Sequence, residues 1–184
     1  MKNSLKAAAA AMSLAFVATG AVAAEKTVMV GGAAMYPSKT IVDNAVNSKD
    51  HTTLVAAVQA AGLVETLKGP GPFTVFAPVN AAFEKLPAGT VETLVKPENK
   101  DTLTTVLTYH VVPGRLTAKD IGAAIKKGGG KATFTTVQGG TLTASNMGGR
   151  YMLTDAKGGM SHVTQADVMQ SNGVIHVVDT VLMP

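Results

Sequence analysis

The residues of this sequence best suited to acid–base chemistry are His110, His176 and Asp179. A histidine and a carboxylate within hydrogen-bonding reach can transfer a proton during a reaction. His176 and Asp179 are separated by three residues in an apolar segment, however, and such a spacing along a strand places two side chains on opposite faces. We therefore expect no acid–base pair. We expect His110 and His176 to be buried residues that hydrogen-bond to the backbone.

Sequence patterns of the common catalytic and cofactor sites are absent. The chain has no G-x-S-x-G nucleophile turn, no H-E-x-x-H zinc pattern, no G-x-x-x-x-G-K-[ST] phosphate loop and no cysteine. The glycine run at residues 128–130 precedes a predicted strand, which is the wrong order for a dinucleotide site. We expect no enzymatic activity, no cofactor and no metal ligand set.

Methionine and histidine form one further chemical pattern. Seven methionines and four histidines follow residue 24, and both residue types suit copper. They are dispersed, with no Met-x-x-Met or His-x-His cluster, so methionine as core filler is the preferred interpretation. A periplasmic carrier of copper or of a small ligand remains the alternative function.

Residues 1–24 have the three-part pattern of a secretory signal peptide. Lys2 and Lys6 precede a short apolar run, and small residues at 21–24 provide the cleavage site. The run is far shorter than the roughly 20 residues that a membrane span requires. We expect export to the periplasm or the exterior, a mature chain that starts near Glu25, an N-terminal extension at residues 25–37 and a domain at residues 38–184.

The composition of the mature protein argues against some functional classes. Loss of Lys2 and Lys6 lowers the net charge from +4 to about +2, and the remaining basic residues are mostly scattered lysines. Nucleic-acid binding is not indicated, because a basic patch and aromatic stacking residues are both missing. The roughly 160 remaining residues suit one domain, which we expect to be a monomer that does not span a membrane.

Apolar residues recur at helical spacing up to residue 127. The pattern predicts helices at residues 38–46, 50–62, 63–67, 80–86, 98–110 and 117–128. Ser38, Asp50 and Asn80 are expected as N-caps, and Thr117 with Asp120 resembles a capping box. Tyr109 is expected to hold a loop carbonyl through its hydroxyl.

Alternation with period two, interrupted by glycine pairs, is typical of strands and predominates after residue 130. Strands are predicted at residues 73–77, 132–137, 141–145, 151–154, 161–165, 174–178 and 180–183. Helices first and a glycine-punctuated meander second favour an α+β fold.

Three segments resemble the fasciclin-like family. Residues 74–83, TVFAPVNAAF, are similar to its first motif, with Val79 where threonine is usual. Residues 107–114, LTYHVVPG, are similar to its central Tyr-His segment, and residues 172–184, NGVIHVVDTVLMP, to its last motif. Motif residues Asn80, Tyr109, His110, Asn172, His176 and Asp179 are expected to be mainly structural. The resemblance implies a wedge-shaped β-sandwich flanked by helices, with the first and last motifs as neighbouring strands.

The resemblance also implies adhesion or matrix contact and no catalysis. Asp167-Val168 matches in position an Asp-Ile segment linked with adhesion in animal members, so Asp167 and Val168 are the candidate partner-binding residues. We expect the pair to lie in a surface segment between two strands, as a loop or helical turn. The predicted function is therefore that of an exported adhesion or recognition module whose partner is a cell-surface or matrix protein or a polysaccharide.

Overall fold

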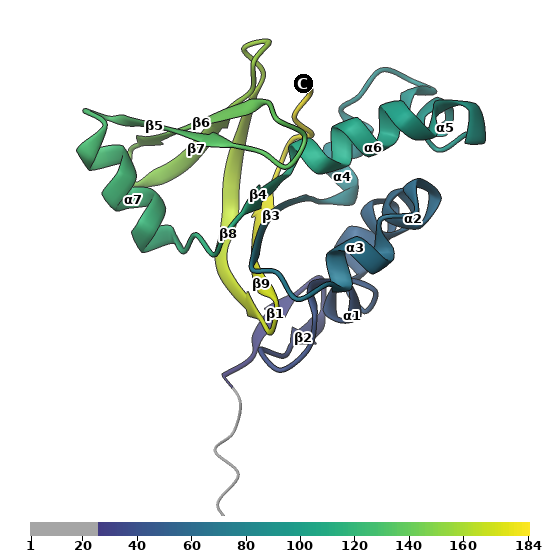
Figure 1. Ribbon diagram of the computed structural model, residues 1–184, viewed down its shortest axis with the longest axis horizontal. Coiled ribbons are helices and arrows are strands. Elements are labelled where there is room, and N and C mark those ends of the chain that lie inside the picture. Colours follow the sequence, from purple (N-terminus) through teal and green to yellow (C-terminus); the bar gives the residue numbers. More distant parts are fainter. Residues whose placement is uncertain (1–25) are drawn as a thin grey trace, which may run out of the picture.

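The computed structural model describes residues 26–184, so the predicted signal peptide and its cleavage site lie outside the described residues. Figure 1 shows a strongly curved sheet with most helices gathered on one side and a single long helix on the other. The predicted α+β class is confirmed. Within residues 26–184, no helix is both long enough and apolar enough to cross a bilayer.

Seven strands form the main sheet: β3 (Phe73–Pro78), β4 (Val111–Pro113), β5 (Lys131–Thr135), β6 (Thr141–Met147), β7 (Arg150–Thr154), β8 (Met160–Gln170) and β9 (Gly173–Val178). Their spatial order is β4-β3-β9-β8-β7-β6-β5. β3 and β9 pair in parallel, and all other neighbours are antiparallel. The first and last motifs therefore form adjacent strands, as expected.

The long strand β8 belongs to both halves of this sheet. Its first residues pair with β7 and its later residues with β9, with register shifts between Val163 and Val168. The two halves turn toward each other, and the amide of Val137 donates to the carbonyl of Val111 at 2.8 Å where the far edges meet. The two layers of the expected wedge are thus halves of one nearly closed sheet (Figure 1).

Two predictions about the C-terminal segment were wrong. The segment that contains Asp167 and Val168 was expected in a loop or helical turn, but β8 continues to Gln170 through its bulges. Bulges add residues to one strand and break the period-two pattern that identifies a strand in sequence. Residues 180–183 were expected as a strand and form none.

Side chains, not a neighbouring strand, bind the backbone of residues 180–183. The amide of Leu182 donates to Nε2 of His110, and the amide of Met183 donates to Oδ2 of Asp155, each at 3.0 Å. The amide of Thr180 donates to Oγ of Ser161 at 3.1 Å. Because these side chains bind the backbone amides of residues 180–183, the segment needs no hydrogen bonds to a neighbouring strand.

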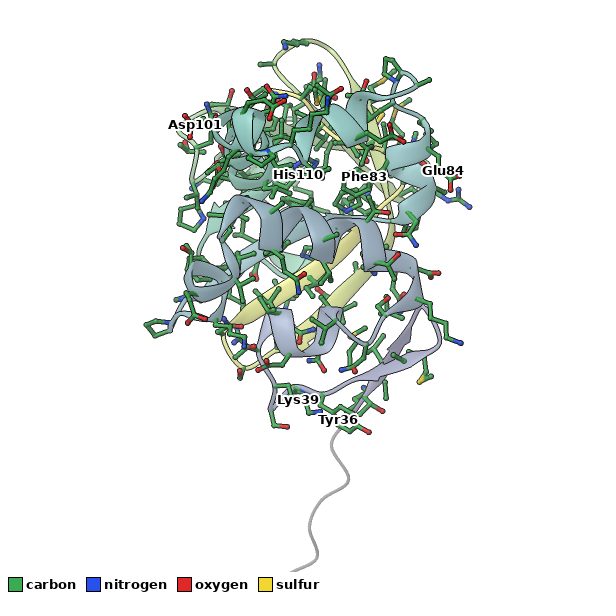
Figure 2. All side chains as sticks on the ribbon, turned by 90° about the vertical axis from the view of Figure 1, so that its right-hand side faces the viewer. Tyr36, Lys39, Phe83, Glu84, Asp101 and His110 are labelled. Carbon is green, nitrogen blue, oxygen red and sulfur yellow. The ribbon has the colours of Figure 1, made fainter. Side chains whose placement is uncertain are left out.

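Helices occupy the segments between strands. They are α1 (Ile41–Ala45), the 3₁₀ turn η1 (Lys49–His51), α2 (Thr52–Ala61), α3 (Val64–Lys68), α4 (Asn80–Glu84), α5 (Thr90–Leu94), the 3₁₀ turn η2 (Pro97–Asn99), α6 (Lys100–Tyr109) and α7 (Ala118–Lys127). α1 to α6 cover one face of β3 and β9, whereas α7 packs on β5 and β6 (Figure 1). Figure 2 views the α1–α6 side, where Phe83 is buried and Glu84 and Asp101 are exposed.

The helix ends confirm some of the expected caps and correct others. Gly62 ends α2 in a left-handed conformation with φ of 72°, and Thr117 and Asp120 form the predicted capping box of α7. Ser38 was expected to cap α1, but residues 36–39 form a turn and the side chain of Thr40 caps the helix by accepting from the amide of Asp43. Asp50 was expected to cap α2, but it lies inside η1.

The expected N-terminal extension contains a hairpin that belongs to the fold. β1 (Val28–Val30) pairs with β2 (Ala33–Met35), and β2 packs on β8 and α1. Val30 and Met35 are 5% and 3% exposed and join the core. The hairpin therefore packs against the domain expected at residues 38–184.

Two apolar cores lie on opposite sides of β3 and β9. One fills the space between these strands and α1–α6, and includes Val75, Ala77 and Val177. The other lies between the two halves of the sheet and beneath α7, and includes Phe76 and Val178. Both central strands are buried on both faces, which explains their nearly continuous apolar sequences.

Candidate functional site

Asp167 lies in β8 where the pairing with β9 shifts register. Its φ of 59° is a left-handed conformation, which aspartate adopts more readily than most residues. The half-buried carboxylate accepts a hydrogen bond through Oδ1 from the backbone nitrogen of Ala118 at 2.7 Å. Ala118 is the first residue of α7, so Asp167 satisfies an amide that has no partner within the helix.

Val168 does not share this position. Its side chain is 1% exposed and packs in the core between the sheet and α1–α6. Successive residues of a strand point to opposite faces, and the face of Val168 is the one that packs on the core. The expected Asp167-Val168 contact pair is therefore corrected: Val168 cannot contact a partner together with Asp167.

A surface groove of about 750 Å³ adjoins Asp167. It lies between the β1–β2 hairpin, the loop before α7 and the end of β8. Its lining residues are Lys26, Val28, Met35, Pro37, Arg115, Thr117, Asp167, Met169, Gln170 and Ser171. We call this the Asp167 groove. It combines an acidic group, two basic groups and apolar side chains, a mixture that suits a polar partner with some apolar surface.

Arg115 is a groove residue that sequence reasoning did not single out. Its Nη2 donates to the carbonyls of Gln170 at 3.1 Å and Ser171 at 3.4 Å, which fixes the guanidinium beside the end of β8. A guanidinium has five N–H donors, so this arrangement leaves donors for a partner. Its place after the Pro113-Gly114 turn and its status as one of two arginines were the available sequence signals.

His176 is buried and uses both ring nitrogens within the protein. Nε2 lies 2.7 Å from the carbonyl of Leu116, and Nδ1 accepts from the amide of Asp167 at 3.4 Å. The ring stacks on Phe76 with centroids 5.6 Å apart. Burial lowers the pKa of His176, although the Leu116 carbonyl and the Asp167 charge oppose this effect. The prediction of a buried, backbone-bonded histidine is confirmed.

Asp179 makes a separate surface cluster and no contact with His176 that could relay a proton. Its Oδ1 accepts from the amide of His162 at 2.8 Å, and Oδ2 lies 3.5 Å from Nδ1 of the same residue. Partial burial acts to raise the pKa of Asp179, but the bonds from His162 and Thr180 and the nearby charges outweigh it and lower the pKa. Asp179 therefore fixes the chain after β9.

Tyr109 and His110 connect α6 to distant loops. The Tyr109 hydroxyl donates to the carbonyl of Thr141 at 2.6 Å and accepts from the amide of Ala156 at 3.0 Å, as predicted for a loop-holding tyrosine. His110 bonds through Nδ1 to the carbonyl of Val106 at 2.8 Å and accepts the Leu182 amide at Nε2. Burial lowers the pKa of His110. Both residues have structural roles.

Asn80 was expected to cap its own helix and instead caps α2. The structure gives α4 no side-chain cap at its start. Oδ1 of Asn80 accepts from the amide of Thr53 at 3.0 Å and from Oγ1 of Thr52 at 3.2 Å, while Nδ2 donates to the carbonyl of Lys49 at 2.8 Å. His51, the N-cap residue of α2, makes no side-chain cap hydrogen bond. Asn80, 27 positions after Thr53, supplies that bond instead.

Asn172 connects three elements. Its Oδ1 accepts from the amide of Ile41 at the start of α1 at 3.0 Å. Its Nδ2 donates to the carbonyls of Leu67 at 2.6 Å and Gly69 at 3.0 Å after α3, and its own carbonyl accepts from Phe73 at 3.0 Å. The side chain is buried, and both its oxygen and its nitrogen are hydrogen-bonded within the protein, so its role is structural.

The methionines only partly follow the expectation of core filling. Met35 is buried, but Met29, Met147 and Met160 are more than half exposed. Among the described residues, no three His, Cys, Asp or Glu side chains gather closely enough to hold a metal ion. Core filling therefore explains Met35 and leaves the three exposed methionines unexplained.

Comparisons with known proteins match most of the chain. The fasciclin domain family matches residues 49–184. Protein sll1483 of Synechocystis sp. is 48% identical over 160 residues, covering 87% of this chain and 82% of that protein. Uncharacterized protein sll1735 of the same organism is 41% identical over 143 residues, covering 78% of this chain and 96% of that protein.

A solved structure has the same fold. It is a FAS1 domain pair from the insect cell adhesion molecule Fasciclin I, which matches with a TM-score of 0.71 and 19% sequence identity over 81% of this chain and 52% of that chain. At this identity the likeness concerns the fold alone. The match of the family model to residues 49–184 shows that the chain belongs to the fasciclin domain family.

Proposed function

We propose that this protein is an exported adhesion or recognition module that binds a cell-surface or matrix partner, either a protein or a polysaccharide, without catalysing a reaction. The observation that carries the proposal is the Asp167 groove, in which Arg115 and Asp167 lie beside apolar side chains on the protein surface. Members of the fasciclin domain family include a cell adhesion molecule, which supports the same function class.

The charges of the groove suit recognition. Oδ1 of Asp167 is occupied by the Ala118 amide, whereas Oδ2 has no hydrogen bond to any residue in the described part of the chain. A half-buried carboxylate oxygen beside an exposed guanidinium offers an acceptor and a donor side by side. Amide groups of a peptide and hydroxyl groups of a sugar each supply both functions.

The two motif histidines, His110 and His176, do not support catalysis. His110 and His176 each direct both ring nitrogens at backbone groups and are 3% and 0% exposed, so neither can reach a substrate. A general base must lie within hydrogen-bonding reach of the proton that it removes. This favours a binding role over an enzymatic one.

Capture of an envelope component tests this proposal. The exported protein, tagged at its C-terminus, is incubated with solubilised envelope from the producing cells, and bound material is compared between wild type, Arg115→Gln and Arg150→Gln. Arg150 is the other exposed arginine and lies outside the groove, so it serves as the matched control. We expect Arg115→Gln alone to lose the captured component. Equal capture by all three proteins would remove the Asp167 groove from the proposed function.

A further inference from the structure

Two sides of the Asp167 groove, the end of β8 and the loop before α7, are bound to one buried side chain, that of His176 in β9. On the β8 side, the amide of Asp167 donates to Nδ1 at 3.4 Å. On the loop side, Nε2 lies 2.7 Å from the carbonyl of Leu116. Leu116 stands between Arg115 and Thr117, which both line the groove. A single imidazole therefore connects the two sides.

The two contacts determine the tautomer of His176. A carbonyl oxygen only accepts, so Nε2 carries the hydrogen that is donated to Leu116. Nδ1 is then unprotonated and can accept from the amide of Asp167. Burial lowers the pKa of His176 and so favours this neutral ring. The ring stacks on Phe76 and is 0% exposed, so packing fixes its orientation.

The backbone of Asp167 depends on this support. Its φ of 59° lies in the left-handed region, which residues other than glycine adopt only when their surroundings hold them there. The bond from its amide to His176 and the bond from Ala118 to its carboxylate are the two contacts that do so. Without an acceptor at Nδ1, the amide loses its partner and the bulge can relax toward extended backbone. The carboxylate then moves away from Ala118.

The loop on the other side is held from below in the same way. The amide of Leu116 donates to Oγ1 of Thr74 at 2.8 Å, and the Thr74 hydroxyl donates to the carbonyl of Gly114 at 2.7 Å. Thr74 and His176 are both fully buried. Both backbone polar groups of Leu116 are thus bound by buried side chains, which sets the position of the neighbouring Arg115 at the groove.

We propose that His176 is a positioning residue of the Asp167 groove. Through Nδ1 it places the Asp167 carboxylate, and through Nε2 it places the loop that carries Arg115. It does not touch the partner, because the ring has no exposed surface. The effect on partner binding rests on the proposed function, whereas the effect on Asp167 can be measured without a partner.

Two substitutions separate the two contacts of His176. His176→Asn introduces an amide oxygen close to the position of Nδ1, so it can accept from Asp167 but is too short to reach Leu116. His176→Gln introduces an amide close to the position of Nε2, so it keeps a donor for Leu116 and loses the acceptor for Asp167. Both changes remove the stacking on Phe76. Asparagine leaves the larger gap, so lost packing alone would harm His176→Asn more.

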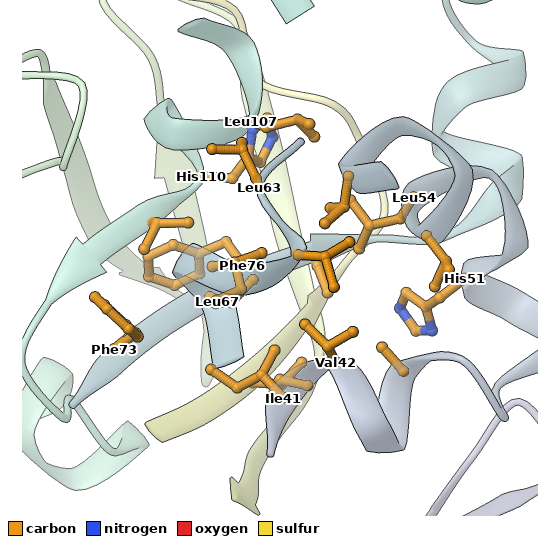
Figure 3. Close-up of a pocket in the computed structure, with 18 of the residues that line it drawn as sticks. Ile41, Val42, His51, Leu54, Leu63, Leu67, Phe73, Phe76, Leu107 and His110 are labelled. Atoms are coloured by element: carbon orange, nitrogen blue, oxygen red, sulfur yellow. The ribbon is translucent and has the colours of Figure 1, made fainter. Parts of the chain in front are cut away.

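His110→Gln is the matched control for loss of a buried histidine. His110 is 3% exposed and also uses both ring nitrogens, bonding to the carbonyl of Val106 and the amide of Leu182. It lines the apolar pocket between the sheet and the α1–α3 helices, not the groove (Figure 3). A general loss of stability therefore appears in this variant without a change at Asp167.

Hydrogen exchange of the Ala118 amide reports the position of Asp167, because this amide donates to Oδ1. The Ile121 amide in the same helix, which donates to the carbonyl of Thr117, is the reference for overall stability. We expect His176→Gln to raise the ratio of Ala118 to Ile121 exchange by about fivefold, the value of one hydrogen bond, and His176→Asn and His110→Gln to change it less. A ratio in His176→Gln equal to that of wild type would overturn the proposal.

Nitrogen NMR of the imidazole rings provides a test that needs no variant. In wild type, His176 should carry its hydrogen on Nε2 and His110 on Nδ1, since each of these nitrogens faces a carbonyl. A hydrogen on Nδ1 of His176 would leave no acceptor for the amide of Asp167 and would overturn the proposal even if the variants fail to fold.

Attachment to whole cells of the producing organism tests the consequence for binding. We expect His176→Gln to attach about three- to tenfold more weakly than wild type, His176→Asn to lose less, and folded His110→Gln to equal wild type. If Asp167→Asn is weakened and His176→Gln is not, the proposed function stands and this inference is wrong. If Asp167→Asn attaches as wild type does, the proposed function fails, and the Ala118 exchange ratio still decides whether His176 positions Asp167.

Discussion

Oδ1 of Asp167 lies 2.7 Å from the backbone nitrogen of Ala118, and this bond joins strand β8 to the first turn of α7. The same residue borders the groove to which we assign partner binding. A carboxylate at a helix N-terminus is stabilised by the helix dipole as well as by the bond. Asp167 therefore has a structural oxygen and a second oxygen that a partner can use.

Asn80 should be important for stability although it does not cap its own helix. Asn80→Ala removes the bonds to Thr53, Thr52 and Lys49, and we expect it to lower the free energy of unfolding by about 1–2 kcal/mol. Asn80→Asp keeps the acceptor for the Thr53 amide and should cost less. Urea unfolding of the three proteins measures both effects. An alanine variant as stable as wild type would mean that water replaces this cap without loss.

We expect the buried histidines to make the protein less stable at mildly acidic pH. Burial lowers the pKa of His51, His110 and His176, so the unfolded state takes up protons below pH about 6.5 that the folded state does not. The free energy of unfolding should therefore be constant above pH 7.5 and fall as the pH drops below about 6.5. Each histidine contributes a slope of up to about 1.4 kcal/mol per pH unit.

Urea unfolding between pH 7.5 and 5.0 checks this dependence. His51→Gln should lower the pH slope of the free energy of unfolding by up to about 1.4 kcal/mol per pH unit, the contribution of one histidine. The pH is kept above 5 because Asp43, Asp120 and Asp179, whose pKa values are lowered, lose their stabilising effect only at more acidic pH. A stability independent of pH across this range would contradict the assignment of neutral buried histidines.

Processing is the prediction that concerns export. The pattern of residues 1–24 predicts cleavage after Ala23 or Ala24, so the exported protein should start at Ala24 or Glu25. Intact-mass spectrometry of envelope and culture fractions measures this start. Recovery of the full 184-residue chain from those fractions would show that residues 1–24 are not a cleaved signal.

Local sequence patterns identified most elements and the buried histidines. Residues 73–77 and 174–178 were recognisable as central strands because they are apolar on both faces. Gly62 and the Thr117–Asp120 box marked helix ends through local chemistry. These features depend on neighbours within a few residues, so one sequence suffices to predict them.

Features that depend on distant partners were missed. Asn80 caps a helix 27 residues earlier, and Asp167 binds α7 49 residues earlier. The bulges of β8 place Val168 in the core, although a loop was expected there. The groove arises because the hairpin at residues 28–35 packs beside β8, which no local pattern indicates.

Asp167→Asn separates the two roles of Asp167 and tests the central claim. Asparagine keeps an oxygen for the Ala118 amide and tolerates the positive φ, so the free energy of unfolding should change by less than about 0.5 kcal/mol. Alanine would lose the bond and cannot distinguish the roles. Glu92→Gln is the matched control, because Glu92 is an exposed carboxylate on α5, far from the groove (Figure 1).

The deciding measurement is attachment of the exported protein to whole cells of the producing organism at matched concentration, for wild type, Asp167→Asn and Glu92→Gln. Circular dichroism confirms that all three are folded. Charges at the rim of an interface act mainly on encounter rate and register, so we predict that Asp167→Asn attaches about three- to tenfold more weakly and that Glu92→Gln equals wild type. Equal attachment of all three folded proteins would contradict the assignment of partner binding to Asp167.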